Sequence, residues 1–163
     1  MLSRDLLPAM KPNSHRLCPS SIVNLDTFKH QNMELHLKIT GILLIILALI
    51  HISFPKYFKW KQELNSLSIM NRQLMYVHSF FIALAVLLIG LLCLTSANDL
   101  IGTTLGKRIS LGLGLFWAIR LFIEFFGYSA KIWKGKAFET TVHVLFSVFW
   151  AYLSSLFCLI YID

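Results

Sequence analysis

Residues 109–127 read ISLGLGLFWAIRLFIEFFG, a long apolar run that nevertheless carries two full charges. Arg120 and Glu124 stand one helical turn apart in its second half. A run of this length is roughly what an α-helix needs to cross a hydrocarbon layer of about 30 Å. Charged side chains inside such a segment are costly to bury and are functional candidates by default. We therefore expect a membrane helix whose charged pair belongs to a site.

Three further apolar runs accompany this one, at about 37–54, 74–95 and 140–161. The chain has 163 residues, of which 56% are hydrophobic and only 14% are charged, whereas a soluble domain is about one quarter charged. This pattern predicts an all-α integral membrane protein with four transmembrane helices in an antiparallel up-down-up-down bundle. Pro55 is expected to end the first span, and residues 96–108, SANDLIGTTLGKR, are expected to form a polar turn.

The N-terminal residues 1–32 differ from the rest, because they hold three prolines and scattered polar residues with no apolar block. They are predicted to form a polar, disordered tail. An alternative is that translation begins at Met33, since MELHLKITGILL is typical of the start of a short membrane protein. Residues 33–163 are predicted to form a single four-helix transmembrane domain in either case.

Small and polar residues recur at helical spacing on three of the spans, which marks the faces that pack against other helices. The first span carries such a face at Gly41, Leu44, Ala48 and His51; the third at Ser110, Leu113, Trp117, Arg120 and Glu124; the fourth at His143, Ser147, Ala151, Ser154 and Cys158. Gly112 and Gly114 are expected to allow close helix approach near the start of the third span.

Four ionisable side chains fall at one depth when the spans are counted through the membrane. With the N-terminus on side A, His51, His78, Glu124 and His143 all lie roughly 4–6 Å inside the side-B boundary, at a rise of about 1.5 Å per residue. Arg120 lies one turn deeper. A four-helix bundle would bring these groups together in its core. The sequence therefore predicts a polar pocket near one membrane face.

Imidazole and carboxylate groups are ligands for transition metals, so His51, His78, His143 and Glu124 are candidate metal ligands. A facing pair of histidines would instead suit b-type haem, with Arg120 beside a propionate. The most specific hypothesis is thus a metal- or haem-binding redox subunit. No HExxH or Glu-x-x-His pair fixes the metal, and Cys18, Cys93 and Cys158 lack the CxxC spacing of zinc or redox motifs.

Two other classes of protein use the same residues differently. Histidine and glutamate side chains relay protons in pumps and carriers, which gives a proton-coupled carrier of a small solute. A non-catalytic accessory or assembly subunit would need the cluster only to specify helix packing. A pore through one subunit is not expected, because the side-A half of the spans is nearly all apolar apart from the serines of the fourth span. The sequence specifies no reaction and favours a protein that is not an enzyme.

Basic residues predict the orientation. Side B carries Lys56, Lys59, Lys61, Arg72, Lys131, Lys134 and Lys136, whereas side A carries Lys38, Lys107 and Arg108 outside the tail. The positive-inside rule then places side B in the cytoplasm and both termini outside, in a bacterial inner membrane. The net charge of +7 fits anionic lipid rather than nucleic acid, because no basic-aromatic nucleic-acid motif is visible. The expected partners are the bilayer and either a membrane-protein partner or a second copy of the chain.

Overall fold

The computed structural model describes residues 19–127 and 137–163, and the side chains of residues 27–127 and 137–163. Its elements are α1 (Pro19–Tyr57), α2 (Trp60–Glu63), a single 3₁₀ turn (Leu64–Ser66), α3 (Ile69–Thr95), α4 (Ala97–Gly102), α5 (Thr104–Phe126) and α6 (Ala137–Ile162). Within these ranges the chain contains helices and turns and no strand. The predicted all-α class is confirmed for the part of the chain that the structure describes.

Four of these helices are long and apolar enough to cross a membrane: Thr27–Tyr57 within α1, α3, α5 and α6. Burial inside the protein is low, since it reaches at most 33% of the residues in the apolar window of any of them. Most of the large apolar side chains on these helices therefore face outward. Exposed apolar surface on this scale is unusual for a soluble monomer and is expected where lipid covers it.

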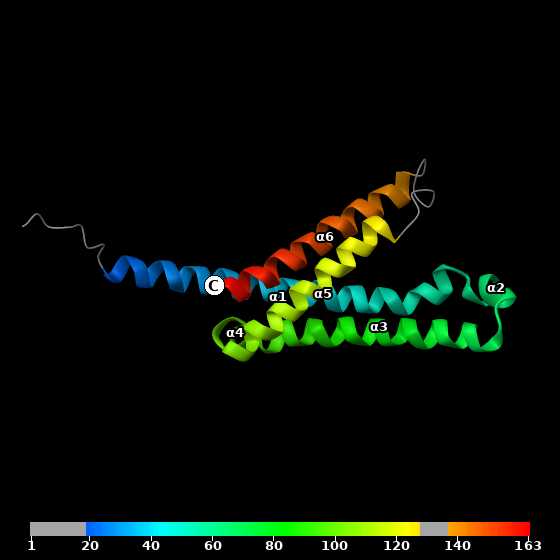
Figure 1. Cartoon of the computed structure of the whole chain (residues 1–163), viewed down its shortest axis with the longest axis horizontal. Coiled ribbons are helices and arrows are strands. Elements are labelled where there is room, and N and C mark those ends of the chain that lie inside the picture. The colour runs from blue at the N-terminus through cyan, green and yellow to red at the C-terminus, as the bar shows by residue number, and fades with distance from the viewer. Residues whose placement is uncertain (1–18, 128–136) are drawn as a thin grey trace, which may run out of the picture.

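The long helices pack as two pairs. Helix α1 lies along α3, α5 lies along α6, and the second pair crosses the first at an angle (Figure 1). The two pairs meet near α4 and diverge toward the opposite end, where α2 lies (Figure 1). The helices thus do not run as one bundle of four parallel axes, and their up-down-up-down passage through a membrane stays a prediction.

Glycines allow the close approach of helices within each pair. A Cβ atom on Gly41 would lie 2.8 Å from the carbonyl oxygen of Gly90, and one on Gly90 would lie 2.9 Å from that of Gly41. Across the other pair, a Cβ atom on Gly114 would lie 2.9 Å from Cys158 Sγ, and Ser154 Oγ donates to the Gly114 carbonyl at 3.2 Å. The predicted packing role holds for Gly41 and Gly114 but not for Gly112, which faces open space.

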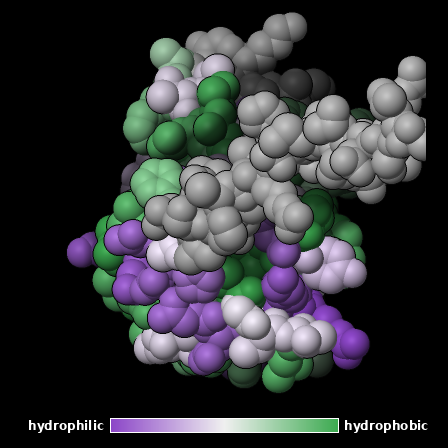
Figure 2. All heavy atoms as spheres, turned by 90° about the vertical axis from the view of Figure 1, so that its left-hand side faces the viewer, coloured by the Kyte–Doolittle hydropathy of each residue, from purple (hydrophilic) through white to green (hydrophobic). Residues whose placement is uncertain are grey.

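Residues 96–108, expected as a polar turn, contain a helix that belongs to the core. Ala97, Leu100 and Ile101 of α4 are all buried, and they pack with Leu37 of α1 and Leu153 of α6 in one apolar cluster. The turn prediction is therefore wrong here, because three apolar residues at helical spacing find neighbours in both helix pairs. Hydrophilic surface gathers around this end of the molecule, most plainly in the lower part of Figure 2.

Helix α1 is longer at both ends than the first predicted span. It begins at Pro19, so residues 19–32 are helical where a disordered tail was expected, and residues 1–18 lie outside the described part. Within this N-terminal part, Lys29 pairs with Asp163, the residue that follows α6. At the other end the helix passes Pro55 and ends two residues later at Tyr57, so Pro55 lies in its last turn and does not itself end it as expected.

Candidate functional site

Glu124 is the centre of a polar cluster on the inner face of α5. Its side chain is 10% exposed, and both carboxylate oxygens have partners. Arg120, one turn earlier on the same helix, donates from Nη1 to Glu124 Oε2 at 2.7 Å. His143 of α6 places Nδ1 at 2.9 Å from Glu124 Oε1. Because an ionised carboxylate can only accept, the imidazole donates in this contact. One buried carboxylate thus joins a guanidinium and an imidazole from two helices.

Aromatic rings cover the deeper side of this cluster. The guanidinium carbon of Arg120 lies 5.3 Å from the ring centroid of Trp150, within the range of a cation–π contact. Trp150 in turn stacks on Trp117, with ring centroids 4.9 Å apart and planes inclined by only 7°. Both indoles are almost fully buried. The stack therefore fixes the position of α6 along α5, next to the Arg120–Glu124 pair.

A cavity of about 190 Å³ lies beside the cluster, between the two helix pairs. Arg120 and Glu124 line it from α5, and His51 lines it from α1. The remaining lining residues are apolar or aromatic: Leu47, Phe54, Ile82, Val86, Phe116, Trp117, Phe146 and Trp150. Ligand sites for drug-sized molecules are usually about 300–1,000 Å³, so this cavity suits a smaller group.

His51 reaches the cavity with a defined orientation. Its Nδ1 lies 2.8 Å from the carbonyl oxygen of Leu47, one turn earlier on α1. A carbonyl oxygen can only accept, so Nδ1 carries the proton in this contact. In the neutral ring, Nε2 is then the acceptor nitrogen. The contact with the Leu47 carbonyl therefore fixes the tautomer of His51. The ring also packs against Phe54, with centroids 4.6 Å apart.

The structure brings together some of the predicted site residues and not others. Glu124, Arg120 and His143 are in direct contact, and His51 faces them across the cavity. His78 is exposed and does not line it. Helix α3 reaches the cavity with Ile82 and Val86, whereas His78 lies one turn nearer to the α2 end, toward which the two pairs diverge (Figure 1). The predicted layer of four ionisable groups is therefore incomplete.

A metal site has little geometric support. Within residues 19–127 and 137–163, no three His, Cys, Asp or Glu side chains lie close enough together to hold a metal ion. Both oxygens of Glu124 already accept hydrogen bonds. Metal or haem ligation by His51, His78, His143 and Glu124 stays a prediction from the sequence.

No protein-family model, no curated protein and no solved structure matches this chain. The chemistry of the site is therefore inferred from its own residues. Trp117 Nε1 and Trp150 Nε1 are buried donors, and neither has a hydrogen-bond partner among the described residues. Buried donors are paired in most proteins, so each unpaired one calls for an explanation.

Sequence reasoning missed Trp150 as a member of the site. It lies seven residues after His143 and four before Ser154, so it shares the inward face of the fourth span. The spacing alone predicts this position, but only small and polar side chains were used to define the inward face of the fourth span. An aromatic ring on such a face is a large packing group, and here it carries the cation–π contact with Arg120.

Proposed function

We propose that this chain is an integral membrane protein that binds a small polar solute between its two helix pairs, in the manner of a proton-coupled carrier. The observation that carries the proposal is the buried contact of Glu124 with both Arg120 and His143 at the wall of a cavity that His51 enters from the other pair. Ionisable groups inside membrane spans commonly belong to proton and solute pathways.

The groups around the cavity favour a solute with at least one hydrogen-bond acceptor. The Arg120 guanidinium supplies donors. His51 Nε2 supplies an acceptor when the ring is neutral. A solute of a few heavy atoms with a carbonyl or carboxylate group would match this set and the volume of about 190 Å³.

Glu124 is the group we assign to proton exchange. Its carboxylate is held by two partners, so a solute that draws Arg120 away would leave it with the His143 contact alone. Loss of a cationic neighbour favours the neutral form of a carboxyl group. Solute binding and proton uptake would thereby be coupled through the Arg120–Glu124 pair.

The arrangement of the helices offers a route to the cavity. The pairs are joined near α4 by a continuous apolar core, and they separate toward the α2 end (Figure 1). The cavity lies between the pairs, so small rocking of one pair against the other would open or close it. With the α2 end in the cytoplasm, as the loop lysines favour, the cavity would open to the cytoplasm.

A second candidate is a non-catalytic subunit in which the cluster only fixes the packing of α5 on α6. The observation that favours it is that Glu124 is already satisfied by protein groups on both oxygens. A fully paired buried network can specify one helix arrangement without binding anything. In that case the partner would contact the outward apolar faces rather than the cavity.

Tryptophan fluorescence separates the two candidates. In a Trp60→Phe/Trp133→Phe background only Trp117 and Trp150 remain, and both line the cavity. Detergent-purified protein is titrated with a panel of small carboxylates, amides, amines and alcohols. We expect a saturable change with at least one acceptor-bearing solute and its loss in Arg120→Gln. A response to no member of the panel, with the protein folded, would leave the packing role as the better account.

A further inference from the structure

The turn between α1 and α3 holds a second cavity, and its charge is unlike that of the first. It has a volume of about 530 Å³ and is lined by Pro55, Lys56, Lys59, Lys61, Gln62 and Tyr76. Three of the six lining residues are lysines, and none is acidic. The site described above lies deeper, between the helix pairs, and shares no lining residue with this one.

The three ammonium groups have no acidic partner in the part of the chain that the structure describes. Among the residues that the structure describes, the ion pairs are formed by other cations, and Lys56, Lys59 and Lys61 form none. All three side chains are exposed. Several like charges held within one short turn repel one another unless an anion lies among them. Residues 55–66 carry these three lysines and one acidic residue, Glu63, so the turn has a net positive charge.

The backbone of the turn is unusual at the middle lysine. Lys59 has φ 48° and ψ 42°, and it is the only non-glycine residue with positive φ among those described. A side chain in this left-handed region is strained relative to the right-handed one. Such outliers often accompany binding sites, where the strain is offset by function. Glycine would serve the turn better, so the presence of lysine has no explanation in the fold alone.

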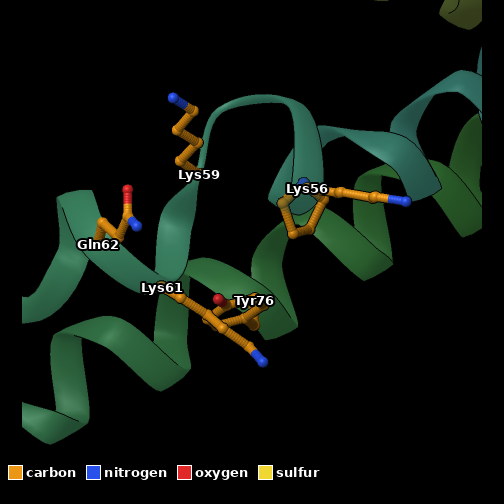
Figure 3. Close-up of a pocket in the computed structure, with 6 residues that line it drawn as sticks. Lys56, Lys59, Lys61, Gln62 and Tyr76 are labelled. Carbon is orange, nitrogen blue, oxygen red and sulfur yellow. The ribbon is translucent and has the colours of Figure 1, made fainter.

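Figure 3 shows how the lysines are arranged. Lys56 and Lys59 extend from α1 and the turn, and Lys61 extends near Tyr76 of α3. Their ammonium groups lie around the turn in different directions instead of meeting at one point. Lysine is a flexible point charge on a four-carbon stem, so these groups can turn toward a single anion that enters the cavity.

Aromatic residues of the same turn suit a position in the head-group layer. Tyr57 and Phe58 are 67% and 52% exposed, and Trp60 packs edge-on against Tyr76 with centroids 5.2 Å apart. Exposed aromatic rings beside lysines at the end of an apolar helix are typical of the membrane–water interface. The anion most available there is the phosphate of a phospholipid.

We propose that the cavity formed by Lys56, Lys59, Lys61 and Tyr76 binds the phosphate of an anionic phospholipid head group. The lysines supply charge, and the Tyr76 hydroxyl supplies a hydrogen-bond donor. Clusters of lysine next to a membrane helix attract anionic lipid with about 1 kcal/mol per residue, which is about fivefold in affinity. The proposal rests on the membrane location and is independent of the solute site at Glu124.

The test compares two charge-matched double variants. Purified protein is mixed with short-chain phosphatidylglycerol or phosphatidylcholine in detergent, and bound lipid is measured by native mass spectrometry. We expect wild type to retain phosphatidylglycerol in preference, Lys56→Gln/Lys61→Gln to bind it about 25-fold more weakly, and Lys107→Gln/Arg108→Gln to bind it as wild type does. Equal retention of the two lipids, or equal loss in both variants, would overturn the proposal.

A competition arm distinguishes the sources of phosphate. Inorganic phosphate and glycerol 1-phosphate are added to the wild-type complex with phosphatidylglycerol. We expect neither to displace the lipid, because neighbouring apolar surface holds its chains. Displacement at concentrations similar to that of the lipid would overturn the assignment to a lipid and would indicate a soluble phosphate ester instead. The thermal stability of each variant is measured in parallel, so that unfolding is not mistaken for lost binding.

Discussion

His143 Nδ1 lies 2.9 Å from Glu124 Oε1, and this contact joins α6 to α5 within the apolar part of the molecule. On the other oxygen of the same carboxylate, Arg120 donates at 2.7 Å. The carboxylate therefore holds one cation on its own helix and one imidazole on the neighbouring helix. Removing it would break both contacts, whereas removing Arg120 would leave the contact between the helices.

Replacing Glu124 with leucine is expected to destabilise the protein strongly. The change removes the carboxylate partner of a partly buried guanidinium, and breaking a buried ion pair in this way costs about 3–5 kcal/mol. The double variant Arg120→Met/Glu124→Leu removes both charges and is expected to recover most of the loss. The free energy of unfolding is measured by denaturant titration in mixed micelles. If the double variant were as unstable as the single one, the Arg120–Glu124 pair would not be the source of the effect.

Alanine at Gly41 or Gly90 is expected to separate α1 from α3. In each case the added Cβ atom would lie within 3 Å of the carbonyl oxygen of the facing glycine, so the backbones must shift. Overpacking of this kind costs about 1–3 kcal/mol. Gly112→Ala is the matched control, because a Cβ atom there meets nothing within 4 Å. Thermal unfolding followed by circular dichroism is the measurement, and an equal effect of all three substitutions would contradict the packing role.

Glycine at Lys59 is expected to stabilise the turn while it weakens lipid binding. Relief of about 1–2 kcal/mol of left-handed strain, less about 0.5–1 kcal/mol for the added freedom of glycine when unfolded, predicts a gain of about 0.5–1 kcal/mol. Lys61→Gly removes the same charge from within α2 and should destabilise instead. Unfolding and phosphatidylglycerol retention are measured on both variants. A less stable Lys59→Gly protein would show that the turn does not strain this residue.

Alanine at His51 and at His78 should have different effects on the two cavity tryptophans. His51 lines the cavity together with Trp117 and Trp150, whereas His78 is exposed and outside it. In the Trp60→Phe/Trp133→Phe background, His51→Ala is expected to shift the emission maximum and to weaken solute binding. His78→Ala should leave both unchanged. Equal responses would contradict the exclusion of His78 from the site.

The apolar helices and the inward position of the charged pair were predictable from the sequence. The long apolar runs predict the membrane-spanning helices. The high cost of exposing Arg120 and Glu124 to lipid predicts that this pair faces inward. The contact with His143 followed in outline from counting depth along the spans. These inferences use only the spacing of residues along the chain, which can be read directly from the sequence.

The division into two pairs was not predictable in the same way. Gly41 and Gly90 are remote in sequence but face each other in the structure. No local sequence pattern predicts which glycine packs against which. The separation of the pairs leaves His78 outside the site. The buried α4 was missed because SANDLIGTTLGKR has a polar composition, while burial depends on three residues at helical spacing, Ala97, Leu100 and Ile101.

Proton movement in proteoliposomes tests the central claim most directly. Wild type, Glu124→Gln and the control Glu63→Gln, which alters an exposed residue of α2, are reconstituted with an internal pH-sensitive dye and exposed to the solute panel. The account predicts a solute-dependent change of internal pH with wild type and Glu63→Gln that is absent with Glu124→Gln. The same change in Glu124→Gln, or no change with any solute for folded wild type, would contradict the assignment of Glu124 to a proton-coupled site.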